Sequence, residues 1–259
     1  MKISILVPTL GTRSKELIRL FESINQQTYK DIEVIVVTQG NHDVVCEILN
    51  QVKLKDAKQV KLDRRGLSIA RNEGLKYATG DIVVLSDDDC WYPVNAIERI
   101  SDLFSNNPRK NILLTQIFDP NKDKLYKDYP KSEGVIKNKI ELLRKSSIEI
   151  TFRRGVLAEE YFDERLGLGG EFCSGEEVDF LIRNFIRDTF YYVPQITVYH
   201  LKKYGKDSKD QVKAKGALYG KHFNIAICLA VLIRDLLIKR ENNFMAFYNG
   251  YMQYKEGKL

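Results

Sequence analysis

Short apolar runs alternate with amphipathic segments through the first half of the chain. Runs rich in β-branched residues occupy residues 3–7, 32–37 and 82–85, and a weaker run occupies residues 59–62. Between these runs, apolar residues recur at every third or fourth position, which is the spacing of an amphipathic helix. Strands that alternate with helices predict a mostly parallel, Rossmann-like sheet with helices on both faces.

The second half continues with further strand and helix patterns. We expect strands at residues 111–118 and 148–153, a polar loop over residues 119–134, and a helix over residues 178–186. A last strand pattern ends at His200, and from about residue 207 the pattern is helical. The sequence therefore predicts an α/β protein over residues 1–205 with a helical C-terminal extension over residues 206–259.

Three consecutive carboxylates follow the apolar run at residues 82–85. Asp87, Asp88 and Asp89 come where that strand should end, and Pro93 then suits the first turn of a helix. Open α/β sheets bind ligands at the carboxyl ends of their strands. Adjacent carboxylates repel one another, and oxygen ligands suit Mg²⁺ or Mn²⁺ bridging to a substrate phosphate. The alternative is a solvated acidic turn in which Asp89 caps the next helix.

Composition narrows the class of protein. The 259 residues are 44% hydrophobic and 29% charged, as in a soluble globular protein. The formal charge of +6 suggests anionic substrates or an anionic membrane surface, and the lack of a dense basic stripe argues against nucleic acid. The four cysteines are scattered, which favours neither zinc nor disulfides. The first residues run directly into a strand without a signal-peptide pattern, so we expect a cytoplasmic protein.

The common glycine-rich nucleotide motifs are absent from the sequence. Gly11 stands alone after the first strand, where a dinucleotide fold would have G-x-G-x-x-G. Other features carry a resemblance to a known family: Pro8-Thr9, Ala70-Arg71-Asn72-Glu73-Gly74, Thr79-Gly80-Asp81, the acidic cluster, and Gly175-Glu176-Glu177-Val178-Asp179-Phe180-Leu181-Ile182-Arg183. In this order they resemble the family 2 glycosyltransferases, which have the GT-A fold, over about residues 1–200. The Asp-Asp-Asp-Cys-Trp-Tyr form is similar to bacterial enzymes that build capsular or other surface polysaccharides.

The resemblance implies a reaction. A hexosyltransferase-like enzyme would move a sugar, with inversion, from a nucleotide-diphosphate sugar to a saccharide or lipid-linked acceptor. Residues 1–110 would form the donor half and residues 111–205 the acceptor half. Asp88 and Asp89 would hold a Mg²⁺ or Mn²⁺ ion, with Asp87 toward the donor ribose. The family often has D-x-D-D at this point, so the assignment is open by one position.

Further residues are candidates for the donor and the metal. By their positions in the family motifs or at strand ends, the donor-side residues are Pro8, Thr9, Thr38, Gln39 and Arg71. Arg71 would pair with diphosphate oxygens, unless it is an ordinary surface arginine. Arg65, which precedes the same helix as Arg71, would add positive field, unless it too is an ordinary surface arginine. The family frequently has a carboxylate at the position of Thr38 or Gln39 to read uracil, and this chain has none. A UDP-sugar is favoured, and other nucleotides stay open. His200 would be a third metal ligand, a phosphate contact or a structural residue.

Glu177 is the candidate general base. It matches the second acidic position of the family motif, where an acid would take the proton of the acceptor hydroxyl. The alternative is that Glu176 and Glu177 only stabilise the N-terminus of the following helix. Residues 167–170, Gly-Leu-Gly-Gly, are conformationally permissive, and we expect a mobile element near the acceptor there.

The C-terminal extension has two interpretations. Residues 223–238 are apolar at their centre and flanked by Lys221, Arg234, Lys239 and Arg240, but the run is too short to span a bilayer. It forms either a buried helix on the sheet or a peripheral contact with the inner face of the cytoplasmic membrane. For the whole chain, the alternatives to a glycosyltransferase are a sugar-phosphate nucleotidyltransferase and a non-catalytic nucleotide-sugar binder of the same fold.

Overall fold

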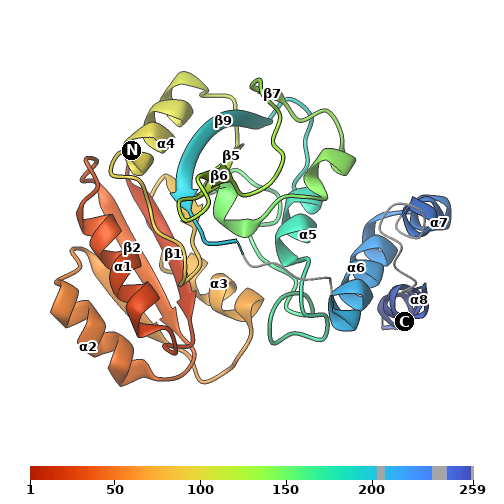
Figure 1. Cartoon of the computed structure of the whole chain (residues 1–259), viewed down its shortest axis with the longest axis horizontal. Helices are drawn as coiled ribbons and strands as arrows, with labels where there is room; N and C mark the ends of the chain where they lie inside the picture. Colours follow the sequence, from red (N-terminus) through yellow and green to blue (C-terminus); the bar gives the residue numbers. More distant parts are fainter. Residues whose placement is uncertain (203–207, 235–243, 258–259) are drawn as a thin grey trace.

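A computed structural model describes residues 1–202, 208–234 and 244–257 (Figure 1). One nine-stranded sheet forms the centre, in the order β3-β2-β1-β4-β8-β5-β9-β7, with β6 paired to β5. The strands are β1 (Ile3–Thr9), β2 (Ile32–Thr38), β3 (Ala57–Lys61), β4 (Ile82–Leu85), β5 (Ile112–Asp119), β6 (Lys124–Leu125), β7 (Gly134–Val135), β8 (Ile150–Arg153) and β9 (Phe190–Tyr199). The first four are parallel, whereas β8 runs antiparallel to both of its neighbours. The predicted α/β class is confirmed, with a mixed sheet.

Helices cover both faces of the sheet. They are α1 (Ser14–Asn25), α2 (His42–Val52), α3 (Leu67–Leu75), α4 (Ala96–Asn106) and α5 (Glu176–Arg183), followed by α6 (Lys209–His222), α7 (Ile225–Arg234) and α8 (Phe244–Glu256). Single 3₁₀ turns lie at Lys139–Leu142 and Ser147–Glu149. One apolar core packs α1, α2 and α4 against the sheet, and a second core packs α3 and α5 against the other face. The sheet is therefore buried on both faces, as its apolar strands predict.

Helix α3 lies unusually close to β1 because of a glycine. A Cβ atom on Gly74 would come within 2.1 Å of Leu6 Cδ1 and 2.9 Å of Val37 Cγ2. A glycine costs a helix interior about 1 kcal/mol relative to alanine, so the contact with the strands explains why it is present. This packing holds the last turn of α3 against β1 and β2.

The Thr79-Gly80-Asp81 segment is held at the opposite edge of the sheet by a carboxylate of β2. Glu33 is 8% exposed and accepts hydrogen bonds from Ser4 Oγ and from the backbone N–H groups of Thr79 and Gly80. Lys2 Nζ pairs with it at 2.7 Å. Burial alone would raise the pKa of Glu33, but hydrogen bonds from Lys2, Ser4 and Thr79 outweigh that effect and lower the pKa to about 2. This motif therefore has a structural role.

Several expected boundaries need correction. Helix α4 begins at Ala96 rather than near Pro93, so Asp89 does not cap it. The expected loop at 119–134 contains β6 and leads into β7, because residues 124–125 pair with β5 and residues 134–135 pair with β9. Helix α5 begins at Glu176 and ends at Arg183, before the expected 186. The expected helical start at residue 207 and the basic residues Lys239 and Arg240 lie outside the described residues.

Helix α7 is not the buried helix on the sheet that one interpretation expected. Among the side chains of α7 that the structure describes, only Cys228 is buried, and it packs in a small cluster with Val212, Tyr219 and Phe247. Ile225, Leu229 and Ile233 are 52%, 46% and 57% exposed. Figure 1 places α6, α7 and α8 together beside α5, away from β1 and β2.

Glu33 gives a test of the fold that depends on pH. Its folded pKa of about 2 lies below the usual 4.5, so ionised Glu33 stabilises the protein fully above pH 4.5, and the effect is lost as the pH falls through about 2. We expect Glu33→Gln to lower the free energy of unfolding by about 2 to 3 kcal/mol near neutral pH. Urea denaturation at a series of pH values measures this effect.

The exposed Glu47→Gln is the matched control, and it should leave the unfolding free energy within about 0.5 kcal/mol of the original. The Glu33→Gln and original curves should converge as the pH approaches about 2. A difference that stays constant across pH would mean that the glutamate acts by packing rather than by its charge.

Candidate active site

A pocket of about 420 Å³ opens at the carboxyl ends of β1 and β4, beside the N-terminal end of α3. Eight of the predicted site residues line it: Pro8, Thr9, Gln39, Arg65, Asp87, Asp88, Asp89 and His200. The pocket lies where an open α/β sheet binds ligands, because several strands end there together. The sequence thus located the pocket and much of its polar lining.

The acidic residues converge on a cation of the protein itself. Arg13 Nη1 donates to Asp88 Oδ1 at 3.0 Å and to Asp89 Oδ2 at 2.6 Å. Thr9 Oγ1 donates to the other oxygen of Asp88 at 2.8 Å. Burial raises the pKa of Asp88, while the bond from Thr9 and the charge of Arg13 oppose that rise. The alternative of a solvated acidic turn is wrong, because these carboxylates are mostly covered and are bound to other side chains.

His200 extends this cluster from the end of β9. Its Nε2 lies 3.0 Å from Asp89 Oδ1, while its Nδ1 is buried without a hydrogen-bond partner among the described residues. The ring is therefore oriented by the acidic cluster. Its place in the pocket agrees with either a metal or a phosphate role.

Arg71 is a buried bridge and not a surface arginine. Its side chain is 0% exposed; Nη2 donates to Asp87 Oδ1 and Nη1 to Glu176 Oε1, each at 3.0 Å. Ser147 Oγ also reaches Asp87, at 3.3 Å. Arg71 does not line the pocket, so any effect on a bound diphosphate would pass through Asp87. One guanidinium thereby joins α3, the acidic loop and α5.

Glu177 lies next to this bridge at the start of α5. Burial raises its pKa well above the usual range of a glutamate, and the neighbouring carboxylate of Glu176 raises it further. A carboxylate with a raised pKa is a stronger base once it has lost its proton. Glu177 does not line the pocket of the acidic cluster, but its neighbour Glu176 is joined to Asp87 of that cluster through Arg71.

Thr38 lies outside the pocket, and the glycine-rich segment lies beside it. Thr38 is fully buried, and its hydroxyl contacts His42 Nδ1 at 2.6 Å, so it does not reach the pocket. The segment at 167–170 was expected near the acceptor as a mobile element. The carbonyl of Leu168 accepts from Leu67 N at 2.8 Å, and Leu168 and Gly169 line the same pocket as the acids. Gly167 lies beside Glu176, and the mobility of the segment stays a prediction.

Arg13 is the main residue of the pocket that the sequence reasoning missed. A signal was available, because Arg13 follows the turn after β1, where ligands bind. Leu168 has no comparable local signal, since its place depends on a contact with α3.

The donor atoms fit a divalent cation. Asp88 and Asp89 supply carboxylate oxygens, and the Nη1 atom of Arg13 shows that a positive charge is accommodated between them. The described residues contain no group of three or more His, Cys, Asp or Glu side chains arranged to hold a metal. Mg²⁺ commonly takes only one or two carboxylates and completes its shell with waters and substrate phosphates. The two aspartates therefore suffice for a metal that arrives with a nucleotide diphosphate.

Solved structures define the class of fold. The structure is similar to that of S. aureus TarS in complex with UDP-GlcNAc, with a TM-score of 0.68 and 21% identity over 94% of this chain and 75% of that one. It is also similar to the mannosyltransferase PcManGT of Pyrobaculum calidifontis in complex with GDP-Man and Mn²⁺, with a TM-score of 0.60, 15% identity, and coverage of 99% and 75%. The expected GT-A fold is confirmed.

The sequence model of glycosyl transferase family 2 matches residues 4–159, and the chain belongs to this family. It is 33% identical over 113 residues to the glucosyl-dolichyl phosphate glucuronosyltransferase of Haloferax volcanii, covering 42% of this chain and 36% of the relative. It is 28% identical to the hyaluronan synthase of Pasteurella multocida over 82% of this chain and 26% of that one. The chain thus spans well under half the length of these curated relatives. The family assignment favours a glycosyltransferase over the nucleotidyltransferase alternative.

Proposed function

We propose that the protein transfers a sugar, with inversion, from a nucleotide-diphosphate sugar to a saccharide or lipid-linked acceptor in surface polysaccharide synthesis. The pocket at the end of β4 supports this proposal most directly, because the three aspartates line it. One of them, Asp87, is joined through the buried Arg71 to Glu176 at the start of α5. In our proposal the acidic cluster binds the diphosphate, and the start of α5, which Arg71 joins to that cluster, supplies the base. A non-catalytic binder would not need the second acidic group.

The donor is a nucleoside diphosphate sugar, with a UDP-sugar favoured. TarS has been solved with UDP and with UDP-GlcNAc, and PcManGT with GDP-Man, which supports this ligand class for a chain of the same fold. Pro8, Thr9, Gln39 and Arg65 line the pocket around the acids. In our proposal they contact the nucleotide, and Asp87 contacts the ribose.

Asp88 and Asp89 would hold Mg²⁺ or Mn²⁺, with His200 beside them. The metal would neutralise negative charge on the departing nucleoside diphosphate. Arg13 would release the two carboxylates when the metal and the diphosphate enter, and its guanidinium would then be free to bind phosphate oxygens. Arg71 holds Asp87 in place throughout.

Glu177 would act as the general base. In its ionised form it takes the proton of the acceptor hydroxyl while that oxygen attacks the anomeric carbon of the donor. Glu176 stays paired with Arg71 and keeps a negative charge beside Glu177. That charge favours the protonated form of Glu177, which means that proton uptake by Glu177 is favourable.

The acceptor would be presented at a membrane surface. Among the described residues, no helix has both the length and the apolar character needed to cross a membrane. Helix α7 exposes Ile225, Leu229 and Ile233 at four-residue intervals, so they form one apolar face of the helix. We propose that this face lies on the inner surface of the cytoplasmic membrane, where the lipid-linked acceptor is found.

The metal role predicts chelator-sensitive binding. Calorimetry with UDP and GDP, with Mn²⁺ or with EDTA, should show binding that weakens by at least about tenfold under chelation, because two carboxylates would otherwise face the diphosphate. Asp89→Ala should abolish the metal dependence, and exposed Asp43→Ala is the matched control. Equal affinity with and without chelator would contradict the metal assignment.

The base role predicts a separation of binding from chemistry. Using UDP-Glc, UDP-GlcNAc, UDP-Gal, UDP-GlcA and GDP-Man in turn, we expect Glu177→Gln to keep donor affinity and to slow nucleotide release by about 10² to 10⁴-fold. For the unaltered protein, the rate should rise with pH through the raised pKa of Glu177, since only its ionised form is a base. Glu176→Gln removes a neighbouring charge, so the rise should move to lower pH. Normal turnover by Glu177→Gln would place the base elsewhere.

The membrane role predicts flotation with anionic liposomes. Each lysine or arginine near the surface adds about 1 kcal/mol of attraction, so binding should weaken as salt rises. Leu229→Asp should release the folded protein, because Leu229 is 46% exposed and its loss leaves no cavity. Val156→Asp, at a site 48% exposed on the catalytic part, is the control and should float normally. If the unaltered, folded protein does not float, α7 does not bind the membrane, and only the acceptor is located there.

A further inference from the structure

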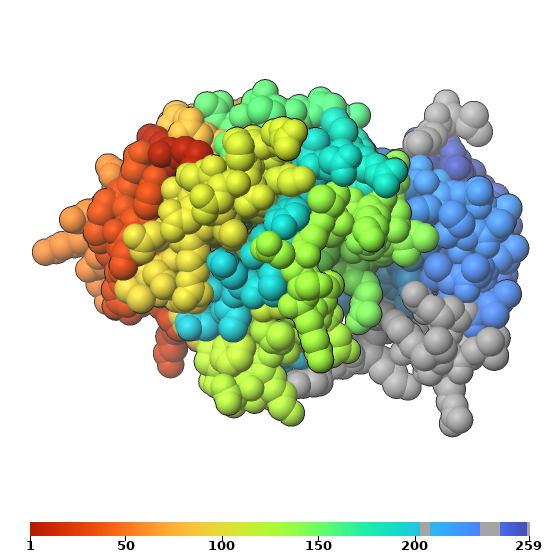
Figure 2. Space-filling model, turned by 90° about the horizontal axis from the view of Figure 1, so that it is seen from above, coloured from red at the N-terminus to blue at the C-terminus, as the bar shows by residue number. Residues whose placement is uncertain are grey.

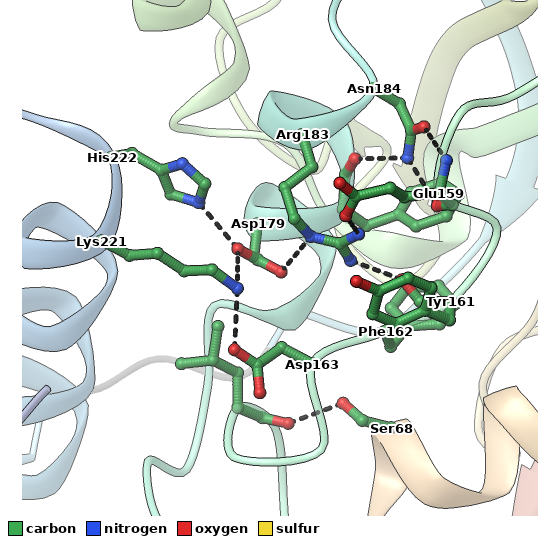
Figure 3. A network of polar contacts seen from close by, with 12 residues as sticks. Ser68, Glu159, Tyr161, Phe162, Asp163, Asp179, Arg183, Asn184, Lys221 and His222 are labelled. Atoms are coloured by element: carbon green, nitrogen blue, oxygen red, sulfur yellow. Dashed lines mark hydrogen bonds and ion pairs between the residues drawn. The ribbon is translucent and has the colours of Figure 1, made fainter. Parts of the chain in front are cut away.

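A buried carboxylate joins α5 to the C-terminal helices (Figure 3). Asp179 is 0% exposed and lies two residues after Glu177. Its Oδ1 accepts from Lys221 Nζ at 2.6 Å and from His222 Nε2 at 2.7 Å, while its Oδ2 accepts from Arg183 Nε at 2.8 Å. Lys221 and His222 are the last residues of α6, so two of the three donors come from the C-terminal extension.

Lys221 also connects a second acid to the same helix. Its Nζ pairs with Asp163 Oδ2 at 2.7 Å, and Tyr254 of α8 donates to that oxygen at 3.2 Å. Asp163 lies in the segment that leads to Leu166. The carbonyl of Leu166 accepts a hydrogen bond of 2.6 Å from the hydroxyl of Ser68, which lies on α3. One lysine therefore connects α5, α6 and the segment that borders the pocket, as Figure 3 shows.

The network stays charged inside the protein. Burial would raise the pKa of Asp179, but hydrogen bonds from His222 and Lys221 outweigh it and lower the pKa to about 2. A buried carboxylate that loses its partners is strongly unfavourable, so Asp179 must keep these donors close. The position of α5 is consequently tied to that of α6.

The contacts of Asp179 also set the orientation of Glu177, because both residues lie on the short helix α5. Glu176 and Asp179 are three residues apart and so are neighbours on the helix surface. Arg71 holds Glu176 and the C-terminal helices hold Asp179, which fixes the rotation of a helix only eight residues long. So short a helix does not hold its own position in water. Glu177 projects about 100° around the helix from Glu176, and its direction follows from that rotation.

We propose that Lys221 and His222 are positioning residues for the transfer reaction, which hold Glu177 in its working orientation through Asp179. The proposal rests on the proposed function of Glu177. It makes α6 a part of the catalytic unit rather than an appended membrane-binding element. Lys221 and His222 do not line the pocket of the acidic cluster, so their loss should affect chemistry more than donor binding.

The test compares Lys221→Met with a control on the same helix. Lys209→Met removes an exposed lysine from the first turn of α6 and should change nothing. For Lys221→Met we expect nucleotide release to slow by about 10-fold to 10²-fold, since small misplacements remote from the chemistry have effects of that size. The affinity for UDP or GDP should stay within about twofold of the original. Lys221→Arg, which restores a cation, should recover part of the rate.

Hydrogen exchange provides a readout that needs no activity. Amides of residues 176–183 should exchange faster in Lys221→Met than in Lys209→Met, because Asp179 of α5 has lost its ion pair with Lys221 and keeps only His222 and Arg183. His222→Gln leaves Lys221 and Arg183 on Asp179, so it should fold even if Lys221→Met does not. It should give the same changes at smaller size.

The outcomes separate this inference from the proposed function. If no donor is turned over by the unaltered protein, the proposed function fails, and the exchange of α5 still decides whether α6 holds the helix. Unchanged exchange and unchanged turnover in folded His222→Gln would overturn the inference. A parallel loss of nucleotide affinity and turnover would also overturn it, because it would show a general structural role.

Discussion

The buried guanidinium of Arg71 is the interaction on which the rest of the site depends. Burying a charge is unfavourable unless it is paired in good geometry, and Arg71 meets that condition with Asp87 on one side and Glu176 on the other. In the proposed reaction, Asp87 belongs to the part of the chain that binds the donor, and Glu176 adjoins the residue that activates the acceptor. Each carboxylate, in turn, would repel its acidic neighbours without the arginine. The close packing at Gly74 brings α3 near enough to the sheet for Arg71 to reach both.

The sequence predicted the fold and the acidic pocket because both follow from local patterns. Apolar runs of strand length and the position of the aspartates after residues 82–85 are legible without any distant contact. The burial of Arg71 cannot be predicted from local sequence, since its partner Glu176 is 105 residues away. The same holds for Leu168, which is placed by a backbone contact with α3. Thr38 is an instructive error: alternation along a strand puts Thr38 and Gln39 on opposite sides, and only Gln39 faces the pocket.

The two faces of the C-terminal extension have different chemistry. Toward the sheet, α6 meets α5 with Lys221 and His222, both bound to a fully buried aspartate (Figure 3). On α7 the large side chains described as exposed, those of Ile225, Leu229 and Ile233, are aliphatic. Figure 2 shows the extension as a mass beside the rest of the protein rather than over it. Ion pairs and hydrogen bonds are directional, so the charged face keeps the extension in a fixed position on the catalytic part. Apolar contacts are not directional, so the other face can rest on a fluid membrane surface.

The C-terminal helices also carry a mark that could be recognised in other sequences. A Cβ atom at Gly216 of α6 would lie 2.0 Å from the carbonyl oxygen of Phe247, and one at Gly250 of α8 would lie 1.9 Å from that of Lys213. The two helices thus meet backbone to backbone, and no larger residue fits at either point without forcing them apart. Homologous chains that keep this arrangement should keep glycine at both positions. The pair would then distinguish, within a large and diverse family, the members that share this extension from those in which another structure follows the catalytic sheet.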